Sequence, residues 1–443
     1  MRPLLIKPAL RLRGKVALLG DKSIAHRSII VSAITSGKTK ITNFPNNKDC
    51  IYTLKAFRRL GIKIILNPRL STVTVFGKGL LGLNKPTSPI YVGDSGTTLR
   101  LILGVLAGQK FSVKLLCGKS LVRRPMLRVT KPLRMMGAKI DARHPAGGTR
   151  GEEYPPIAIK GGNLKPINYK TPVASAQVKS AILLAGLYAK GKTRVVERLK
   201  TRDHTERILK LFRAGIQLKQ NNIIISGNKE LVSPKRIHIP GDISSASFFI
   251  VLATILPNSR LILKNLSLNP SRTGMIKVLK RMGANIRVIS QASGVRRFEP
   301  AGDLLIKSSK LNGTRVKKEE IPFLIDELPI LMVASCYAQG RTVFEGVGEL
   351  RVKETDRISS MSSNLNKMGA KIEVTKGVKS EYIIIQGARK LTGCHLKSFG
   401  DHRTAMSTVV AGLAAHGKSR IDDIGCISKS FPDFLNILRA LVR

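Results

Sequence analysis

The sequence predicts an α/β protein built from two lobes of nearly equal length. Two observations carry this prediction: a helix–glycine–strand pattern that recurs along the chain, and a Pro-Gly break near its middle. The composition agrees, because 43% hydrophobic residues with 39 Gly and 21 Pro is typical of globular domains and not of disordered or fibrous chains. A chain of 443 residues is long enough for two or three domains, each with its own core.

The recurring pattern reads apolar–x–x–apolar–Gly–apolar–x–apolar. In each copy, a helix with one apolar face carries Lys or Arg in its last turn, where cations favour the helix dipole. We expect glycine to take the left-handed capping position and an alternating strand to follow, as at 62–66 and 370–374. The copies are FRRLGIKI (57–64), LRMMGAKI (133–140), LFRAGIQL (211–218), LKRMGANI (279–286) and LNKMGAKI (365–372), with a sixth helix at 434–443.

Six copies divide naturally into three and three. The punctuation Pro240-Gly241 follows the strand-like segment 236–239 and marks the division. We therefore predict a first lobe at 21–239 and a second lobe made of 240–443 together with an N-terminal strand in 1–20. Because small-molecule sites concentrate at domain interfaces, the active site is expected in the cleft between the lobes.

The net charge is unusually high, with 77 Lys and Arg against 27 Asp and Glu, giving +50. Such a balance is typical of nucleic-acid-binding proteins. Here, however, the basic residues are spread over the whole chain, and few aromatic residues (7 Tyr, 13 Phe, no Trp) are present to stack on bases. We expect small, multiply charged anions as ligands rather than nucleic acid. The size of the surplus has no functional explanation in the sequence.

Membrane insertion, disulfides and metal binding are not expected. The longest apolar runs, such as 248–256, reach half of the roughly 20 residues that a spanning helix needs, and no signal-peptide core is present at the start. The five cysteines are far apart, odd in number and without a CxxC, which argues against a disulfide framework or a thiolate zinc site. We therefore expect a cytoplasmic protein without a bound metal.

Polar clusters stand at the starts of several predicted helices. In GDKSIAHR (20–27), Asp21 can cap the helix, and the bases beside it lie at the positive helix N-terminus, which is a ready anion site. In GDSGTTLR (93–100), Gly96 permits a close backbone approach. Each cluster alone is also compatible with an ordinary capped helix and solvated bases.

Later clusters mix acids with bases, which suits proton transfer beside anion binding. They are SAQVKS (175–180), TRDHTER (201–207), IDELP (325–329), KETDR (353–357) and GDHR (400–403). Three histidines, His26, His204 and His402, fall inside such clusters, and we interpret them as polar or packing groups because no metal-ligand spacing is present. Cys117 is expected to be a structural thiol rather than a nucleophile.

Taken together, these motifs resemble one family, the 5-enolpyruvylshikimate-3-phosphate (EPSP) synthases, or 3-phosphoshikimate 1-carboxyvinyltransferases. The resemblance runs from residue 20 to residue 434, and ten motifs follow in the expected order. Besides those quoted above, they include RRPM (123–126), PGDISSAS (240–247), RVKETDR (351–357), GDHRTAM (400–406) and SFPDF (430–434).

The resemblance implies a fold and a reaction. The fold would be a two-lobed inside-out α/β barrel with three repeated βαβαββ units per lobe. The reaction would transfer the enolpyruvyl group of phosphoenolpyruvate to the 5-hydroxyl of shikimate 3-phosphate and release phosphate, a step of aromatic amino acid biosynthesis. No metal or organic cofactor is implied, and a monomer is expected.

The resemblance also assigns residue roles. Asp326 would accept the proton of the 5-hydroxyl, and Glu354, helped by Lys22, would protonate the methylene carbon. Shikimate 3-phosphate would contact Lys22, Ser23, Arg27, Ser175, Gln177, Arg202, Asp326 and Lys353. Phosphoenolpyruvate would contact Lys22, Gly96, Arg124, Gln177, Arg357, Arg403 and Lys429.

Two positions depart from the family pattern or vary within it. Asp94 stands where the family usually has Asn, and an acid beside phosphoenolpyruvate would repel it unless it is protonated or turned away. Lys429 matches only some members. Gly96 leaves room in the phosphoenolpyruvate pocket, so we expect glyphosate to compete.

Three other readings explain less of the chain. A UDP-N-acetylglucosamine enolpyruvyl transferase would show Lys-Asn where this chain has Lys22-Ser23, and a cysteine just before the Arg-Pro, whereas Cys117 lies in a different context. An RNA 3′-phosphate cyclase would show a nucleotide-linked histidine near the C-terminus, whereas His402 lies in GDHRTAM. A basic nucleic-acid-binding protein without catalysis would leave Asp326 and Glu354 without a purpose.

Overall fold

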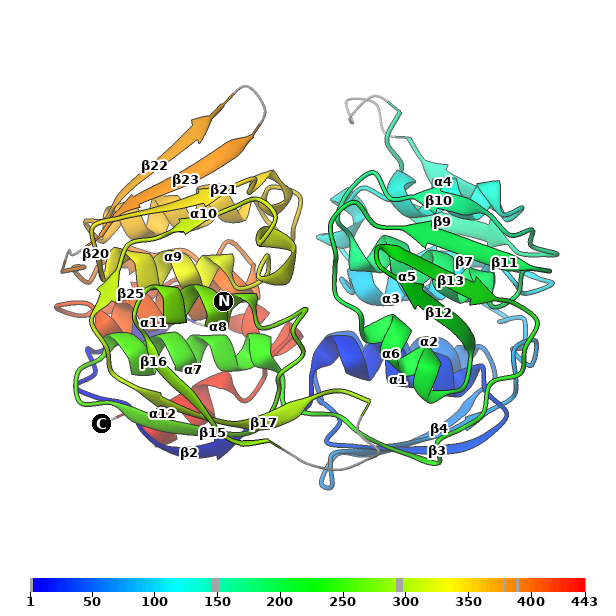
Figure 1. The fold of residues 1–443 in the computed structure, drawn as a ribbon, viewed down its shortest axis with the longest axis horizontal. Helices are drawn as coiled ribbons and strands as arrows, with labels where there is room; N and C mark the ends of the chain where they lie inside the picture. Colours follow the sequence, from blue (N-terminus) through cyan, green and yellow to red (C-terminus); the bar gives the residue numbers. More distant parts are fainter. Residues whose placement is uncertain (1–2, 145–150, 292–297, 378–379, 388–389, 443) are drawn as a thin grey trace. The chain divides into compact units, whose positions relative to one another are not determined.

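The structure is a computed structural model that describes residues 3–144, 151–291, 298–377, 380–387 and 390–442. The chain divides into two compact units, and the fold is mixed α/β (Figure 1). Unit 1 consists of Met1–Leu19 and Pro240–Arg443, and unit 2 is the continuous segment Gly20–Ile239. The backbone therefore passes from unit 1 into unit 2 once and returns once.

Unit 2 alternates strands with two kinds of helix. Its helices are α1 (Lys22–Ala33), α2 (Lys48–Arg59), α3 (Gly96–Leu106), α4 (Leu127–Met135), α5 (Ala176–Gly186) and α6 (His204–Leu211), with the short 3₁₀ helix η1 (Leu121–Arg123). Its strands are β3 (Gly37–Thr42), β4 (Lys63–Asn67), β5 (Thr72–Gly77), β6 (Ile90–Tyr91), β7 (Ser112–Leu116), β8 (Lys139–Arg143), β9 (Tyr154–Lys160), β10 (Asn168–Lys170), β11 (Lys192–Val196), β12 (Gly215–Lys219), β13 (Asn222–Ser226) and β14 (Arg236–His238).

The two kinds of helix follow from their sequences. Helices α1, α3 and α5 are buried on nearly every side and carry no acidic residue in the first turn and no basic residue in the last. Helices α2, α4 and α6 are amphipathic and end in Lys or Arg. A helix that is apolar all round belongs inside a domain, whereas an amphipathic helix covers its outside. Gly104 lets α3 pack tightly on α5, since a Cβ there would lie 2.3 Å from the carbonyl oxygen of Ala181.

Three four-stranded sheets of unit 2 share one arrangement, in the orders β14-β3-β5-β4, β6-β7-β9-β8 and β10-β11-β13-β12. In each sheet the first two strands are parallel and the remaining pairs are antiparallel. Parallel neighbours need a crossover. In two of the sheets the buried helices α3 and α5 supply it, whereas β14 reaches its sheet from the end of the unit.

Unit 1 contains a similar set of elements. Its helices are α7 (Ile243–Ile255), α8 (Gly274–Arg281), α9 (Leu328–Cys336), α10 (Arg357–Lys367), α11 (His402–Ala414) and α12 (Phe434–Leu441), with η2 (Ile321–Phe323), η3 (Gly348–Leu350) and η4 (Gly425–Lys429). Its strands are β1 (Leu4–Ile6), β2 (Arg13–Ala17), β15 (Arg260–Ser267), β16 (Asn285–Gln291), β17 (Ala301–Lys307), β18 (Leu311–Asn312), β19 (Arg315–Val316), β20 (Ala338–Gln339), β21 (Arg341–Glu345), β22 (Lys371–Lys376), β23 (Glu381–Gln386), β24 (His395–Leu396) and β25 (Ser419–Ile421).

The buried helices α7, α9 and α11 pack on one another in unit 1 (Figure 1). Two four-stranded sheets, β16-β17-β15-β2 and β19-β21-β23-β22, have the arrangement found in unit 2. A third sheet has the order β1-β25-β24, and β18 pairs with β20. Strand β1 lies antiparallel to β25, and β2 lies parallel to β15, so both N-terminal strands complete sheets made from the C-terminal half of the chain.

The N-terminal prediction needs correction. One strand was expected in residues 1–20, but this region forms two strands, β1 and β2, in two different sheets. Pro8 lies between them and cannot donate a backbone hydrogen bond to a sheet. The first helix is also shorter than expected: α1 ends at Ala33, and Gly37 instead begins β3.

Four of the five predicted capping glycines adopt the left-handed backbone: Gly61, Gly137, Gly283 and Gly369 have φ between 83° and 109°. The prediction is wrong for Gly215, which begins β12. There Arg213 takes the left-handed position with φ 58°, and Ala214 donates to the carbonyl of Leu209 as the next turn closes. The LFRAGIQL match was therefore shifted by two residues, because Gly215 imitated the capping glycine.

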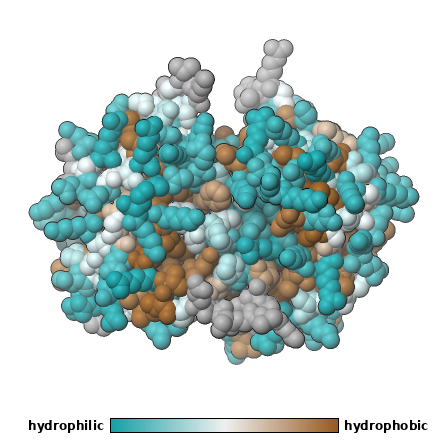
Figure 2. Space-filling view, in the orientation of Figure 1, coloured by the Kyte–Doolittle hydropathy of each residue, from teal (hydrophilic) through white to brown (hydrophobic). Residues whose placement is uncertain are grey.

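The surface is predominantly polar. Hydrophilic residues cover much of the face in Figure 2, and many lysines and arginines on the outer strands are exposed, among them Lys38, Lys40 and Lys63. Among the described residues, no helix is long and apolar enough to cross a membrane.

Candidate active site

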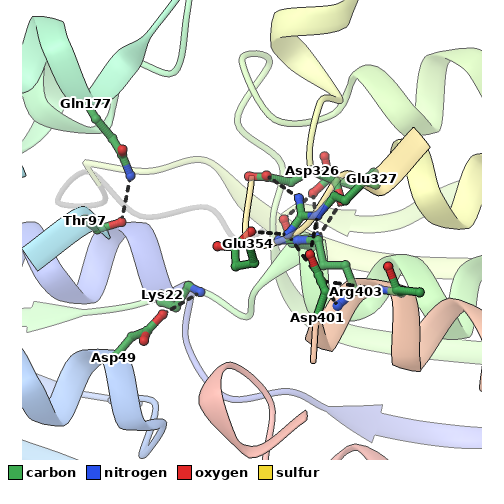
Figure 3. A network of polar contacts seen from close by, with 12 residues as sticks. Lys22, Asp49, Thr97, Gln177, Asp326, Glu327, Glu354, Asp401 and Arg403 are labelled. Atoms are coloured by element: carbon green, nitrogen blue, oxygen red, sulfur yellow. Dashed lines mark hydrogen bonds and ion pairs between the residues drawn. The ribbon is translucent and has the colours of Figure 1, made fainter. Parts of the chain in front are cut away.

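The first polar cluster lies at the start of α1 in unit 2. Asp21 caps the helix by accepting a hydrogen bond from the backbone N–H of Ile24 at 3.0 Å, as predicted. Lys22, the first residue of the helix, pairs with Asp49 of α2, with 3.1 Å between Nζ and Oδ2 (Figure 3). The two side chains are 18% and 17% exposed, so this ammonium is held in place while still open to solvent.

Arg27 is almost completely buried and is fixed at all three nitrogens of its guanidinium. Nε donates to Oγ1 of Thr205 at 2.6 Å, Nη2 donates to Oγ of Ser180 at 2.9 Å, and Nη1 donates to the carbonyl of Ser23 at 2.9 Å. The contacts join α1 to α5 and α6. Arg27 and Ser23 therefore meet at one place in the fold, although the partners that orient Arg27 lie more than 150 residues away.

Gly96 and Arg124 also lie together. Gly96 begins α3, whose cap is Ser95. A Cβ built on Gly96 would lie 2.8 Å from Nη1 of Arg124 and 3.0 Å from Nη1 of Arg100. The absence of a side chain at residue 96 thus lets two guanidinium groups approach a helix N-terminus, where backbone N–H groups and the helix dipole favour an anion.

Gln177 is held by α3 at both ends of its amide. Its Oε1 accepts a hydrogen bond from Nη1 of Arg100 at 2.7 Å, and its Nε2 donates to Oγ1 of Thr97 at 2.9 Å (Figure 3). Two residues earlier, Ser175 caps α5. The SAQ and GDSGTT motifs therefore form one polar surface on neighbouring buried helices.

Asp94 is turned toward the backbone of a loop. Its Oδ1 accepts hydrogen bonds from the N–H groups of Ser120 and Leu121, at 3.0 and 3.1 Å. These residues lead into η1 and then to Arg124. A carboxylate at this position therefore supports the loop that presents Arg124, which is one of the two arrangements that would relieve its repulsion of an anion.

Arg202 lies half-buried in the segment between β11 and α6. Thr201, just before it, donates from its backbone N–H to Oε1 of Glu197 at 3.1 Å. The segment that carries Arg202 is thereby fixed to the end of β11.

The second cluster lies in unit 1 and is centred on Arg357, the first residue of α10. The Arg357 side chain is 1% exposed and contacts three acids. Nη2 lies 2.6 Å from Oε2 of Glu354, Nε donates to Oδ2 of Asp401 at 2.8 Å, and Nη1 lies 3.4 Å from Oδ1 of Asp326. Burial disfavours the charged guanidinium, but the attraction of Asp401, Glu354 and Asp326 outweighs it and raises the pKa of Arg357 above its usual range.

Asp326 and Arg403 are joined through the backbone. Nη1 of Arg403 donates to the carbonyl oxygen of Asp326 at 2.8 Å and lies 3.7 Å from Oε1 of the buried Glu327 (Figure 3). Asp401 caps α11 by accepting from the N–H of Arg403 at 2.7 Å. The IDELP and GDHR motifs thus fold into one cluster of alternating charges.

Lys353 and Lys429 lie near the same helices. Lys353 is half-buried between η3 and α10, directly before Glu354, and Lys429 is the last residue of η4, which packs against α11. Each unit therefore gathers its own predicted residues: Lys22, Ser23, Arg27, Gly96, Arg124, Ser175, Gln177 and Arg202 belong to unit 2, and Asp326, Lys353, Glu354, Arg357, Arg403 and Lys429 belong to unit 1.

Metal and thiol chemistry gain no support. No group of three or more His, Cys, Asp or Glu residues that could hold a metal ion occurs in the described part of the chain. Burial raises the pKa of the Cys117 thiol to about 11, and Asp94 adds to the effect, so a nucleophilic thiolate is disfavoured near neutral pH. His26 is buried, with Nδ1 2.6 Å from Oγ1 of Thr53.

Comparison with known proteins identifies the family. The family model for EPSP synthase (3-phosphoshikimate 1-carboxyvinyltransferase) matches residues 6–438. The chain belongs to the EPSP synthase family.

Relatives in this family match over nearly their whole lengths. A 3-phosphoshikimate 1-carboxyvinyltransferase of Desulforamulus reducens is 45% identical over 439 residues, covering 99% of each chain. Another, from Pelotomaculum thermopropionicum, is 46% identical and covers 96% of each. The solved structure of EPSP synthase from Acinetobacter baumannii is similar, with a TM-score of 0.85, 41% identity and coverage of 99% of this chain and 98% of that one. The enolpyruvyl transferase NikO from Streptomyces tendae, 17% identical with a TM-score of 0.76, shares the fold.

Several orienting residues of this EPSP synthase family member were missed by the sequence analysis. They are Asp49 beside Lys22, Arg100 beside Gln177, Thr205 and Ser180 beside Arg27, and Asp401 beside Arg357. Asp49 precedes the FRRLG repeat without any motif of its own. Arg100, Ser180, Thr205 and Asp401, in contrast, all stand inside quoted motifs, so the available signal was their position at the same helix starts as the predicted residues.

Proposed function

We propose that this protein transfers the enolpyruvyl group of phosphoenolpyruvate to the 5-hydroxyl of shikimate 3-phosphate and releases phosphate. Membership of the EPSP synthase family over residues 6–438 is the observation that carries the proposal. The chemistry of the two clusters supports it. Each phosphate monoester carries about −1.5 to −2 charges at neutral pH, and each substrate adds a carboxylate, so the site must compensate about five to six negative charges.

The residues of unit 2 are proposed to bind both anions. Arg27, held at three nitrogens, and Arg202 would contact shikimate 3-phosphate, with Ser23, Ser175 and Gln177 beside them. Arg124, next to the bare N-terminus of α3 at Gly96, would contact phosphoenolpyruvate. Support comes from the geometry, because arginines fixed by neutral hydroxyl and carbonyl groups keep their positive charge available to a ligand.

The residues of unit 1 are proposed to move protons and bind phosphoenolpyruvate. Asp326 would accept the proton of the 5-hydroxyl, and Glu354, helped by Lys22, would protonate the methylene carbon. Both acids contact Arg357, and a positive neighbour favours the carboxylate form that a general base needs. Arg357, Arg403 and Lys429 would contact phosphoenolpyruvate, and Lys353 would contact shikimate 3-phosphate.

The finer points of the architecture belong to the same proposal. Each unit is proposed to be an inside-out α/β barrel of three βαβαββ repeats, with lobes at 21–239 and at 1–20 plus 240–443 and the active site in the cleft between them. The shared strand order of the four-stranded sheets supports the repeats. A cytoplasmic monomer is also proposed, and the five free cysteines support a reducing compartment.

The test is phosphate release from the purified protein. Release should require both phosphoenolpyruvate and shikimate 3-phosphate, and it should stop when either is omitted. Absence of release from a folded protein supplied with both would contradict the proposal. UDP-N-acetylglucosamine in place of shikimate 3-phosphate serves as the specificity control, and it should give no release.

A further inference from the structure

A lysine is fully buried in unit 2, close to the residues proposed for shikimate 3-phosphate. Lys179 lies on α5, one turn after Ser175, and its side chain is 1% exposed. Its Nζ lies 2.6 Å from Oε1 of Glu206 and 3.0 Å from Oε1 of Glu197. Both glutamates are also buried, so three charged groups share one desolvated position. Charges are retained in such a position only when they are closely paired.

Glu197 connects this lysine to Arg202. The carboxylate of Glu197 accepts hydrogen bonds from both the backbone N–H and the hydroxyl of Thr201, the residue before Arg202. One oxygen, Oε1, therefore receives Thr201 and pairs with Lys179. Loss of the lysine would release the tie between α5 and the segment that presents Arg202.

Glu206 connects the same lysine to Arg27. It lies on α6 directly after Thr205, whose hydroxyl receives the hydrogen bond from Nε of Arg27. Thr205 also contacts Ser180, the residue after Lys179. The ion pair between Lys179 and Glu206 thus fixes α6 against α5 at the level where both helices contact Arg27.

The electrostatics of the cluster favour a permanent tether over a proton carrier. Burial disfavours the Lys179 ammonium, but the attraction of Glu206 and Glu197 outweighs this effect and raises its pKa above the ordinary value of 10.5. Burial also raises the pKa of Glu206. The ammonium therefore stays charged throughout the neutral range and can hold two segments with fixed geometry.

We infer that Lys179 is a positioning residue for shikimate 3-phosphate, acting through Glu197 on Arg202 and through Glu206 on Arg27. The inference rests on the proposed function, and it adds a residue that does not touch either substrate. Its distinguishing consequence is selectivity: the binding of shikimate 3-phosphate depends on Lys179, whereas phosphoenolpyruvate is held by Arg124 and by residues of unit 1.

The test is the variant Lys179→Met, which keeps a long unbranched side chain and removes the charge. We expect KM for shikimate 3-phosphate to rise about tenfold, since small displacements of positioning groups have effects of this size or larger. KM for phosphoenolpyruvate should change less than twofold. The matched control is Arg134→Met, which removes the 2.6 Å ion pair with Glu153 in the same unit and should leave KM for shikimate 3-phosphate unchanged.

The outcomes separate the two proposals. An active wild type with an unchanged KM for shikimate 3-phosphate in folded Lys179→Met overturns the inference alone, and an inactive wild type overturns the proposed function. If Lys179→Met does not fold, Glu197→Gln replaces it, because the amide still accepts from Thr201 but loses its charge; KM for shikimate 3-phosphate should then rise about threefold. Amide hydrogen exchange at 198–203 should quicken in the folded variant, and unchanged exchange would overturn the inference.

Discussion

The guanidinium of Arg357 donates from Nε to Oδ2 of Asp401 at 2.8 Å, and neither side chain is more than 1% exposed. Asp401 is also the N-cap of α11, where its other oxygen accepts from the N–H groups of Arg403 and Thr404. One carboxylate therefore fixes a buried arginine and a helix start together. Because an unpaired buried charge is costly, the arginine and the aspartate depend on each other.

The first prediction concerns this pair. Asp401→Asn keeps a good N-cap but removes the charge opposite Arg357, so the free energy of unfolding should fall by about 3 kcal/mol in urea titrations. KM for phosphoenolpyruvate should rise with it. Asp401→Ala also removes the cap and should cost about 1 kcal/mol more. Equal stabilities of Asp401→Asn and the wild type would show that Arg357 does not rely on this carboxylate.

Asp326 is expected to act in turnover rather than in binding. Asp326→Ala should lose most of kcat in a steady-state phosphate-release assay, with KM for both substrates within about threefold of the wild type, because general acid–base catalysis contributes roughly 10²–10⁴-fold. Arg357 keeps Glu354 and Asp401 as partners in this variant, so the fold should persist. Unchanged turnover would remove Asp326 from the mechanism.

Gly96 should govern the phosphoenolpyruvate pocket. Glyphosate at millimolar concentration should inhibit the native protein competitively with phosphoenolpyruvate. Gly96→Ala should raise KM for phosphoenolpyruvate about tenfold and weaken this inhibition, since the new Cβ would lie 2.8 Å from Nη1 of Arg124 and displace it. The control is Gly162→Ala, where no atom lies within 4 Å of the added carbon. Glyphosate without effect on the native protein would refute the open pocket.

Stability should fall on mild acidification because of His26. Burial, together with the charges of Lys22 and Arg27, lowers the pKa of His26 well below its ordinary value of 6.5. Below pH 6.5 the unfolded chain therefore binds a proton that the folded protein excludes, and the free energy of unfolding should drop by up to about 1.4 kcal/mol per pH unit until the folded pKa is reached. Urea titrations at pH 7.0 and 5.5 measure this loss. His26→Gln should reduce the pH dependence, and an unaltered slope would argue against it.

Ionic strength should also affect stability. A net charge of +50 repels itself, and the repulsion acts over about 30 Å at 0.01 M salt but only about 10 Å at 0.1 M. The melting temperature should therefore rise between these two salt concentrations. Sodium chloride and potassium chloride should act alike if screening is the cause. A melting temperature independent of salt would contradict the repulsion.

Local features of the fold were predictable because they depend on neighbours in sequence. The cap at Asp21 and the left-handed glycines, such as Gly61 and Gly369, follow from short patterns that the backbone obeys without help from distant residues. The error at Gly215 has the same origin. A short pattern cannot tell which of two nearby positions closes the helix, and here the packing of α6 places Arg213 in the strained conformation.

The orientation of the site residues was not predictable in the same way. The sequence places Arg27 and Gln177 at helix starts, but their partners Thr205 and Arg100 come from other helices. Only the close packing of buried helices decides which of the many hydroxyl and basic groups meet. Likewise, nothing in KETDR indicates that Arg357 would be buried among three acids, since two of them belong to other motifs.

The two N-terminal strands set an order for folding during synthesis. Residues 20–239 form an uninterrupted unit, so they can fold as soon as they leave the ribosome. Strands β1 and β2, although made first, must wait for β25 and β15. Their unpaired edges are exposed to other chains during this time, and exposed edges promote aggregation. Residue 12 already bridges residue 442, so a circular permutant that begins at residue 20 and links the old termini would make the parts of each unit in succession and remove the wait.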